Sequence, residues 1–150
     1  MMKAETLAGS QTETRFGRTT SAGASVGWHG DVSRPPSIDI DALFKRCMRN
    51  ASFALALLGQ LEATGRQLVD GIALLVVSDD PQAAAEAAHS LKGAAAIIGA
   101  ESIRALAAEI DTVCRSGEAS SAVELVTALR GEMDRCLADI PGARTEIQRR

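Results

Sequence analysis

One short segment, AHSLKGAAAIIGA at residues 88–100, combines a histidine, a lysine and two glycines with alanine and isoleucine. His89 is its most reactive side chain, because a neutral imidazole is a competent nucleophile near pH 7. Lys92 follows three residues later, and its charge can balance the negative charge of a phosphoryl group. Gly93 presents no side chain to an approaching partner, although glycine costs a helix up to about 1 kcal/mol. The spacing indicates a reactive histidine beside a cation and an open approach.

The direction in which His89 points follows from helical geometry. Residues 81–98 are predicted to form a helix, which turns about 100° per residue. With Leu91 at the centre of the buried face, His89 lies about 160° away, on the outer side. The other residues expected on this outer side are Gln82, Ala85, Glu86, Lys92, Gly93 and Ala96. The aliphatic residues of the segment are therefore expected to pack in the core, whereas His89 and Lys92 are expected to face solvent.

Two common uses of histidine fit this position poorly. A catalytic histidine normally has a carboxylate or hydroxyl partner in a cleft, and the convex surface of a helix offers no cleft. A local metal pair needs a second ligand one turn away, where this sequence has Ala85 and Gly93. Cys114 is a poor metal partner, because it is expected on the opposite face of another helix. Nucleophilic attack on a group that a partner delivers is the use that remains.

The elements before and around this segment are also predicted to be helices. A short helix is expected within residues 38–50, with acidic residues early and basic residues late. A long helix over 51–77 follows an N-cap at Asn50. The sequence Asp-Asp-Pro at 79–81 supplies a cap and a first-position proline for the helix that carries the motif. Gly99 is predicted to end that helix.

The C-terminal part of the chain is predicted to add two more helices. The apolar stripe of the first consists of Ile103, Leu106, Ala107, Ile110, Val113 and Cys114. This helix is expected to end at Gly117. The last helix is predicted to begin with a capping box formed by Ser121 and Glu124 and to end at Pro141 and Gly142.

Composition and periodicity together predict an all-α fold. Aromatic residues make up 3% of the chain and tyrosine is absent, so the core must be built from aliphatic side chains that suit helix packing. We expect an antiparallel four-helix bundle with a short additional N-terminal helix. The bundle is predicted to span residues 38–140. A flexible arm rich in glycine, serine and threonine is expected at 1–37, and a solvated tail at 141–150.

Charge and cysteine content argue against several classes of function. The net charge of −3 gives no electrostatic reason to bind nucleic acid or an anionic membrane. No apolar stretch is long enough to span a bilayer, and the first residues lack a secretory signal, so we expect a cytoplasmic protein. Cys47, Cys114 and Cys136 show no zinc or disulfide spacing and are expected to be buried thiols.

The segment HSLKGAAAIIGA resembles the signature of the histidine-containing phosphotransfer (HPt) domains of two-component phosphorelays. That signature is H-x-L-K-G followed by small residues that end in G-A, and the order of the helices matches from about residue 38 to residue 137. The resemblance implies that His89 accepts a phosphoryl group on Nε2 from a receiver-domain aspartate and passes it to another receiver. Lys92 would help to hold the phosphoryl group, and Gly93 would let the receiver's loops close over it.

The resemblance also implies the partners. These are receiver domains of response regulators and hybrid sensor histidine kinases, with Mg²⁺ bound by the receiver and no cofactor or metal on this chain. The residues predicted to dock the partner are Gln82, Ala85, Glu86 and Ala96. Residues 94–96 are all alanine, whereas the family often has a small polar residue after the glycine, so fewer hydrogen bonds are expected around the site. We expect a monomer.

Two other functions remain open on the sequence alone. The chain could be the phosphoacceptor module of a histidine kinase, but it contains no glycine-rich nucleotide site, so any kinase must act in trans. It could instead be an adaptor that binds receivers or kinases without phosphotransfer. In each case we predict a protein that is not a self-sufficient enzyme. Lys92 is expected to be exposed, so its replacement by alanine should slow transfer without affecting folding.

Overall fold

The structure is a computed structural model that describes residues 34–150. Its helices are α2 (Ile40–Arg46), α3 (Ala51–Val77), α4 (Pro81–Ile98), α5 (Glu101–Arg115) and α6 (Ala122–Gln148), with a 3₁₀ turn, η2 (Ala119–Ser121), before α6. No strand occurs in residues 34–150. The predicted all-α fold is therefore confirmed.

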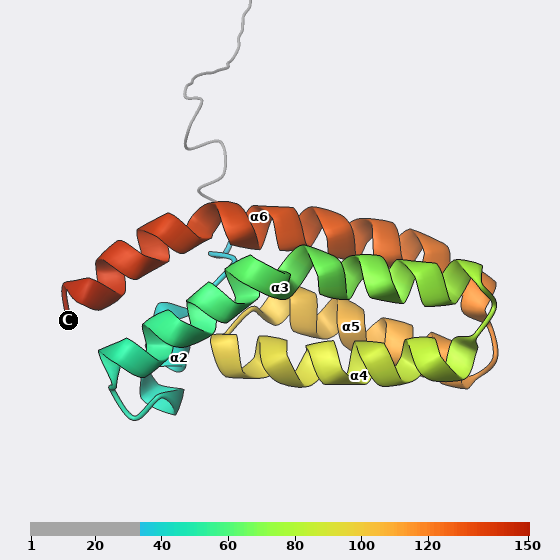
Figure 1. The fold of residues 1–150 in the computed structure, drawn as a ribbon, viewed down its shortest axis with the longest axis horizontal. Helices are drawn as coiled ribbons and strands as arrows, with labels where there is room; N and C mark the ends of the chain where they lie inside the picture. The colour runs from blue at the N-terminus through green and yellow to red at the C-terminus, as the bar shows by residue number, and fades with distance from the viewer. Residues whose placement is uncertain (1–33) are drawn as a thin grey trace, which may run out of the picture. The chain divides into compact units, whose positions relative to one another are not determined.

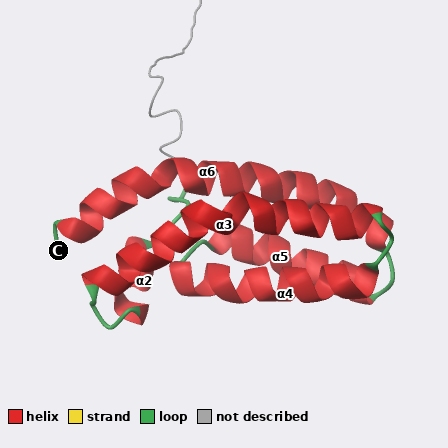
Figure 2. Ribbon diagram, viewed as in Figure 1, coloured by secondary structure: helices red, strands yellow, loops and turns green. Residues whose placement is uncertain are grey.

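Helices α3, α4, α5 and α6 lie side by side as a four-helix bundle, and α3 and α6 extend beyond the other two at one end (Figure 1). Short connections join them, so that successive helices run antiparallel (Figure 2). Within the bundle, α4 packs against α3 and α5, and α6 packs against the same two helices. The short helix α2 covers one end, where it contacts α3, α4 and α6. This arrangement is the predicted bundle, and it places one edge of α4 beside α5.

Local signals determine both ends of α4. Asp80 accepts a hydrogen bond from a first-turn N–H at 3.2 Å, and Pro81 takes the first helical position. Gly99 ends the helix in the left-handed conformation, with φ 82°. A Cβ at Gly99 would also lie 2.7 Å from the carbonyl oxygen of Asp39, so this close approach requires glycine as well. Asn50 caps α3 in the same way, at 2.9 Å. The predicted bounds of both helices are confirmed.

The bundle begins slightly before the predicted boundary. Ser37 is buried, and its hydroxyl donates a hydrogen bond to the Asp139 carboxylate of α6. The compact unit accordingly runs from Pro36 to Arg150. The arm predicted at 1–37 therefore extends too far, and its residues 1–33 lie outside the part of the chain that the structure describes.

The C-terminal residues correct the prediction of a solvated tail at 141–150. Helix α6 continues through Pro141 to Gln148 (Figure 1). Ala143 and Ile147, which follow the proline, are buried. Proline inside a helix costs about 3 kcal/mol, because it removes a hydrogen bond and crowds the preceding turn. Full burial of a large aliphatic side chain such as Ile147 contributes about 1.5–3 kcal/mol, which offsets much of that cost. Tertiary packing thus continues a helix that local sequence rules predict to end.

The start of α6 also differs from the prediction. Ser121 makes no capping hydrogen bond, and its φ and ψ of −73° and −14° are helical. An N-cap residue needs a non-helical, usually extended backbone for its side chain to reach the first-turn N–H groups. The 3₁₀ turn η2 already brings the chain into a helical conformation at this point. The predicted capping box of Ser121 and Glu124 is therefore wrong.

The three cysteines are buried free thiols, as predicted. Burial raises the pKa of Cys136 to about 11, so this thiol remains protonated at neutral pH. Within residues 34–150, no helix combines the length and the apolar content needed to cross a membrane.

Candidate functional site

Helix α4 buries one side and presents His89 on the other. Its buried residues are Ala84, Ala85, Ala88, Leu91, Ala95 and Ile98. The side chain of His89 is 61% exposed. Residues spaced by three and four positions share one face of a helix, which is why the alanines and Leu91 turn inward together. The outward direction predicted for His89 from its angle to Leu91 is confirmed.

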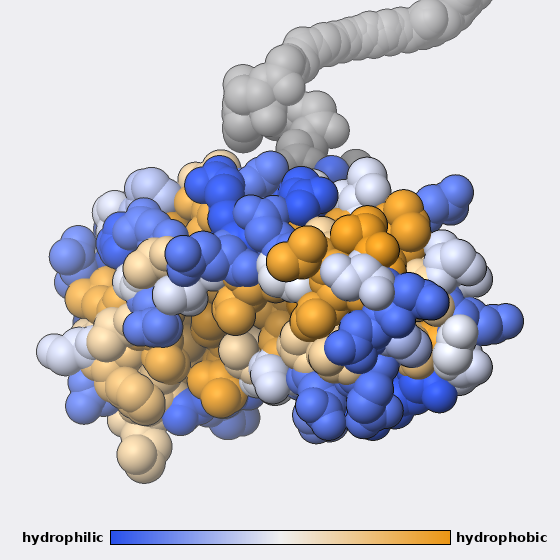
Figure 3. All heavy atoms as spheres, turned by 45° about the vertical axis from the view of Figure 1, so that its right-hand side comes forward, coloured by the Kyte–Doolittle hydropathy of each residue, from blue (hydrophilic) through white to orange (hydrophobic). Residues whose placement is uncertain are grey.

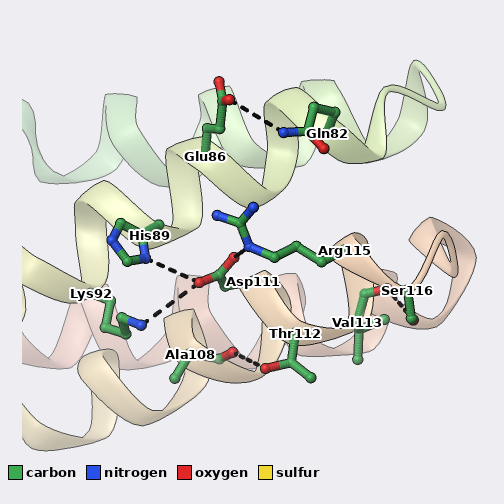
Figure 4. Close-up of polar contacts among 10 residues, drawn as sticks. All are labelled: Gln82, Glu86, His89, Lys92, Ala108, Asp111, Thr112, Val113, Arg115 and Ser116. Atoms are coloured by element: carbon green, nitrogen blue, oxygen red, sulfur yellow. Dashed lines mark hydrogen bonds and ion pairs between the residues drawn. The ribbon is translucent and has the colours of Figure 1, made fainter.

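Part of the predicted docking surface is corrected by the structure. Ala85 is fully buried, because α4 packs against both α3 and α5 and a small side chain allows a neighbouring helix to approach closely. Ala96 is half-buried. Gln82 and Glu86 are exposed, and Gln82 Nε2 donates a hydrogen bond of 3.3 Å to Glu86 Oε2 (Figure 4). The buried side of α4 is thus wider than the single stripe that its periodicity indicates.

His89 has a carboxylate partner on the neighbouring helix. Asp111 of α5 is 10% exposed at its side chain, and its Oδ2 lies 3.2 Å from Nδ1 of His89. The same oxygen lies 3.7 Å from Nζ of Lys92. The other oxygen, Oδ1, accepts a hydrogen bond of 2.5 Å from Nε of Arg115. One buried carboxylate therefore holds an imidazole and two cations from α4 and α5 in a single cluster (Figure 4).

The charge of Asp111 determines which nitrogen of His89 carries the proton. Burial opposes that charge, but hydrogen bonds from His89 and Arg115 and the nearby positive charges outweigh burial, so the pKa of this carboxyl lies below its usual value. An ionised carboxylate only accepts hydrogen bonds, so Nδ1 must be the donor. In the neutral imidazole Nε2 then has a free electron pair. Nε2 lies on the side of the ring away from Asp111 (Figure 4).

Sequence reasoning did not identify this carboxylate partner of His89. A signal for Asp111 was present, because Asp111 lies four residues after Ala107 and three before Cys114, on the apolar stripe of α5. A carboxylate on a buried stripe is unusual and calls for a partner. Periodicity within α5 does not reveal that partner, since it depends on how α5 packs against α4.

Lys92 and Gly93 complete the surroundings of the imidazole. The side chain of Lys92 is 32% exposed, so it is half-buried against Asp111 rather than fully exposed as predicted. Gly93 lies on the surface, and a Cβ built there would have no atom within 4 Å. Nothing in the packing of the bundle therefore requires glycine at this position. The absence of a side chain leaves open space directly beyond Lys92.

Comparisons with known proteins agree on one family. The family model of the Hpt domain matches residues 56–139, a range that includes His89, Lys92, Gly93 and Asp111. The structure is similar to the crystal structure of the HPT domain from the Hpt sensor hybrid histidine kinase from Shewanella, with a TM-score of 0.65 and 17% sequence identity. That likeness covers 73% of this chain and 95% of the other, and it shows the fold. No curated protein matches the chain.

Proposed function

The chain belongs to the Hpt domain family, and on that premise we propose that it is a phosphorelay intermediate in which His89 is the phosphoacceptor. His89 accepts a phosphoryl group from a receiver-domain aspartate, or from a kinase, and passes it to a response regulator. The observation that carries the proposal is the exposed imidazole whose Nδ1 lies 3.2 Å from a buried carboxylate. That contact leaves Nε2 as the nucleophile toward solvent.

The proposed transfer step needs no proton to leave the imidazole. The electron pair of Nε2 attacks phosphorus, an N–P bond forms, and the bond from phosphorus to the receiver's aspartate oxygen breaks, with its electrons, to release a carboxylate. The ring keeps its proton on Nδ1 and becomes positively charged. Asp111 faces that charge and stabilises it. In the reverse direction the neutral imidazole leaves, so the same group can pass the phosphoryl group on.

The other residues of the site have separate proposed roles. Lys92 contacts oxygens of the transferred phosphoryl group, and Gly93 leaves room for the receiver's loops. The chain is proposed to be a phosphotransfer protein without its own nucleotide site, and Mg²⁺ is expected on the receiver. A phosphorylated receiver mixed with the chain should lose its label to the chain, and a second receiver should then take it up. Receiver binding without any such movement of label would instead support the adaptor function.

The receiver is proposed to dock over His89 and along α4 into an apolar groove. Gly93 lies about 40° around the helix from His89, and Ile97 about 80°, so the three form a continuous surface. Beyond them is a groove of about 320 Å³ between α3 and α4, lined by Leu57, Leu61, Leu68, Ala94, Ile97 and Ile98 among others. Exposed hydrophobic side chains gather in patches on the molecule, between hydrophilic ones (Figure 3). Leu68 is exposed and borders this groove.

Ile97→Glu is expected to weaken receiver binding about tenfold, because a charge at an interface core must be desolvated there. Val123→Glu is a matched control, since both side chains belong to residues that are 48% exposed and Val123 lies on α6, outside the groove. Titration of each variant with a receiver domain measures the effect. Equal affinities for the two variants would place the docking surface elsewhere.

Lys92→Ala is expected to slow transfer about tenfold, because a charge-assisted contact to the phosphoryl group is lost. Its melting temperature should change little, since a partly exposed ion pair such as Lys92–Asp111, at 3.7 Å, contributes about 1 kcal/mol or less. Single-turnover transfer and thermal unfolding give the two readouts, with the exposed Lys45→Ala as control. Wild-type transfer, or a large drop in melting temperature, would contradict the role given to Lys92.

A further inference from the structure

The cluster around Asp111 contains a second cation that sequence analysis did not single out. We infer that Arg115 binds the phosphoryl group on His89 together with Lys92, an inference that rests on the proposed function. Arg115 is the last residue of α5, one turn after Asp111. Its Nε donates to Asp111 Oδ1 at 2.5 Å, and its side chain is 48% exposed. It is thus held at the site but remains open to solvent.

The guanidinium of Arg115 has unused hydrogen-bonding capacity. Nε is occupied by Asp111, whereas the two terminal nitrogens make no hydrogen bond to any residue within 34–150. Figure 4 shows these nitrogens extending from Asp111 toward α4, the helix that carries His89. A guanidinium donates through several N–H groups in a fixed plane, which suits the oxygens of a phosphoryl group. Asp111 therefore orients the arginine without using its terminal donors.

Charge balance gives a reason for a second cation. A phosphoryl group on Nε2 brings about −1.5 to −2 charges close to the carboxylate of Asp111. Lys92 is already paired with that carboxylate at 3.7 Å and provides a single positive charge. With the phosphorylated ring positively charged, Lys92 alone would still leave the site with a net charge of about −0.5 to −1. Arg115, held by the other oxygen of the same carboxylate, supplies the further positive charge that the phosphorylated state needs.

The test compares Arg115→Gln and Arg115→Lys with the wild type. Arg104→Gln is the matched control, because Arg104 is also on α5 but pairs with Glu101 in the first turn of that helix, whereas Arg115 is in the last turn. The pH at which phosphohistidine takes up a proton is followed by ³¹P NMR, and the equilibrium of transfer between receiver and chain is measured with label. Arg115→Gln should raise that pH and shift the equilibrium about three- to tenfold toward the receiver. Arg115→Lys should retain part of the effect, and Arg104→Gln should match the wild type.

Three results would overturn the inference, and they differ in whether the proposed function also fails. If the wild type is phosphorylated but Arg115→Gln matches it in both readouts, Arg115 does not contact the phosphoryl group and the proposed function is unaffected. If ¹⁵N NMR shows that Arg115→Gln changes the tautomer of unphosphorylated His89, Arg115 acts by holding Asp111 rather than by binding phosphate. If the wild type accepts no phosphate from any receiver or kinase, the proposed function fails together with the inference.

Discussion

His89→Gln is expected to abolish phosphate acceptance while receiver binding stays within a few-fold of wild type. An amide has no nucleophilic nitrogen, so no N–P bond can form. Glutamine can still donate a hydrogen bond to Asp111, and the position is largely exposed, so the fold and the docking surface should persist. Label incorporated per chain and titration with an unphosphorylated receiver measure the two effects separately.

The second histidine of the chain provides the control for this experiment. His29→Gln should accept phosphate like the wild type, because His89 is the proposed phosphoacceptor and His29 is the other histidine of the sequence. Label that still enters His89→Gln would show that another residue is the phosphoacceptor. A loss of receiver binding of more than a few-fold in His89→Gln would mean that the imidazole contributes to docking as well as to chemistry.

Asp111→Asn is expected to slow transfer about 10- to 100-fold, by analogy with the loss of groups that orient metal-binding histidines. The amide is nearly isosteric but carries no charge, so it neither fixes the proton on Nδ1 nor stabilises the positive ring that forms during transfer. Single-turnover rates give the first effect. The ¹⁵N chemical shifts of the His89 ring report which nitrogen carries the proton. They should show a single tautomer in the wild type and a mixture of the two tautomers in Asp111→Asn. Asp70→Asn is the control, because Asp70 is a carboxylate on α3 that pairs with Arg130 of α6.

The dependence of stability on pH gives a separate check on Asp111. Its pKa is lower in the folded protein than the unfolded value of about 3.9. The resulting stabilisation is present above about pH 4 and is lost as the pH falls from there through the lower folded pKa. The free energy of unfolding should therefore decline less steeply over that range in Asp111→Asn than in the wild type. If the free energy of unfolding falls equally steeply with pH in both proteins, the low pKa of Asp111 is contradicted. If Asp111→Asn transfers phosphate at the wild-type rate and its His89 keeps the wild-type tautomer, Asp111 has no part in the mechanism.

The features that sequence predicted well are those with local causes. Asn50 and Asp80 cap their helices, and Gly99 must adopt a left-handed conformation, so the bounds of α3 and α4 follow from single residues. The outward direction of His89 follows from its angle to Leu91 in the same helix. Each of these causes lies within a few residues of its effect.

The features that sequence missed depend on contacts between helices. The burial of Ala85 and the pairing of Asp111 with His89 both require knowledge of how α4 packs against α5. Helix α6 continues past Pro141 because residues beyond it, including Ile147, are buried against the bundle. A rule based on proline alone does not take into account the stabilisation from burying these later residues. The motif therefore identified the nucleophile, whereas the cluster that orients it became visible only in the fold.

The most direct test of the account is to locate the phosphorus atom in the phosphorylated chain. The protein is labelled with ¹⁵N in histidine and phosphorylated by a receiver, and couplings between ³¹P and the ring nitrogens are recorded by NMR. We predict phosphorus on Nε2 of His89, with the proton retained on Nδ1 next to Asp111. Phosphorus on Nδ1, on a carboxylate or on any other residue would contradict the central claim that Asp111 directs the chemistry to the outward nitrogen.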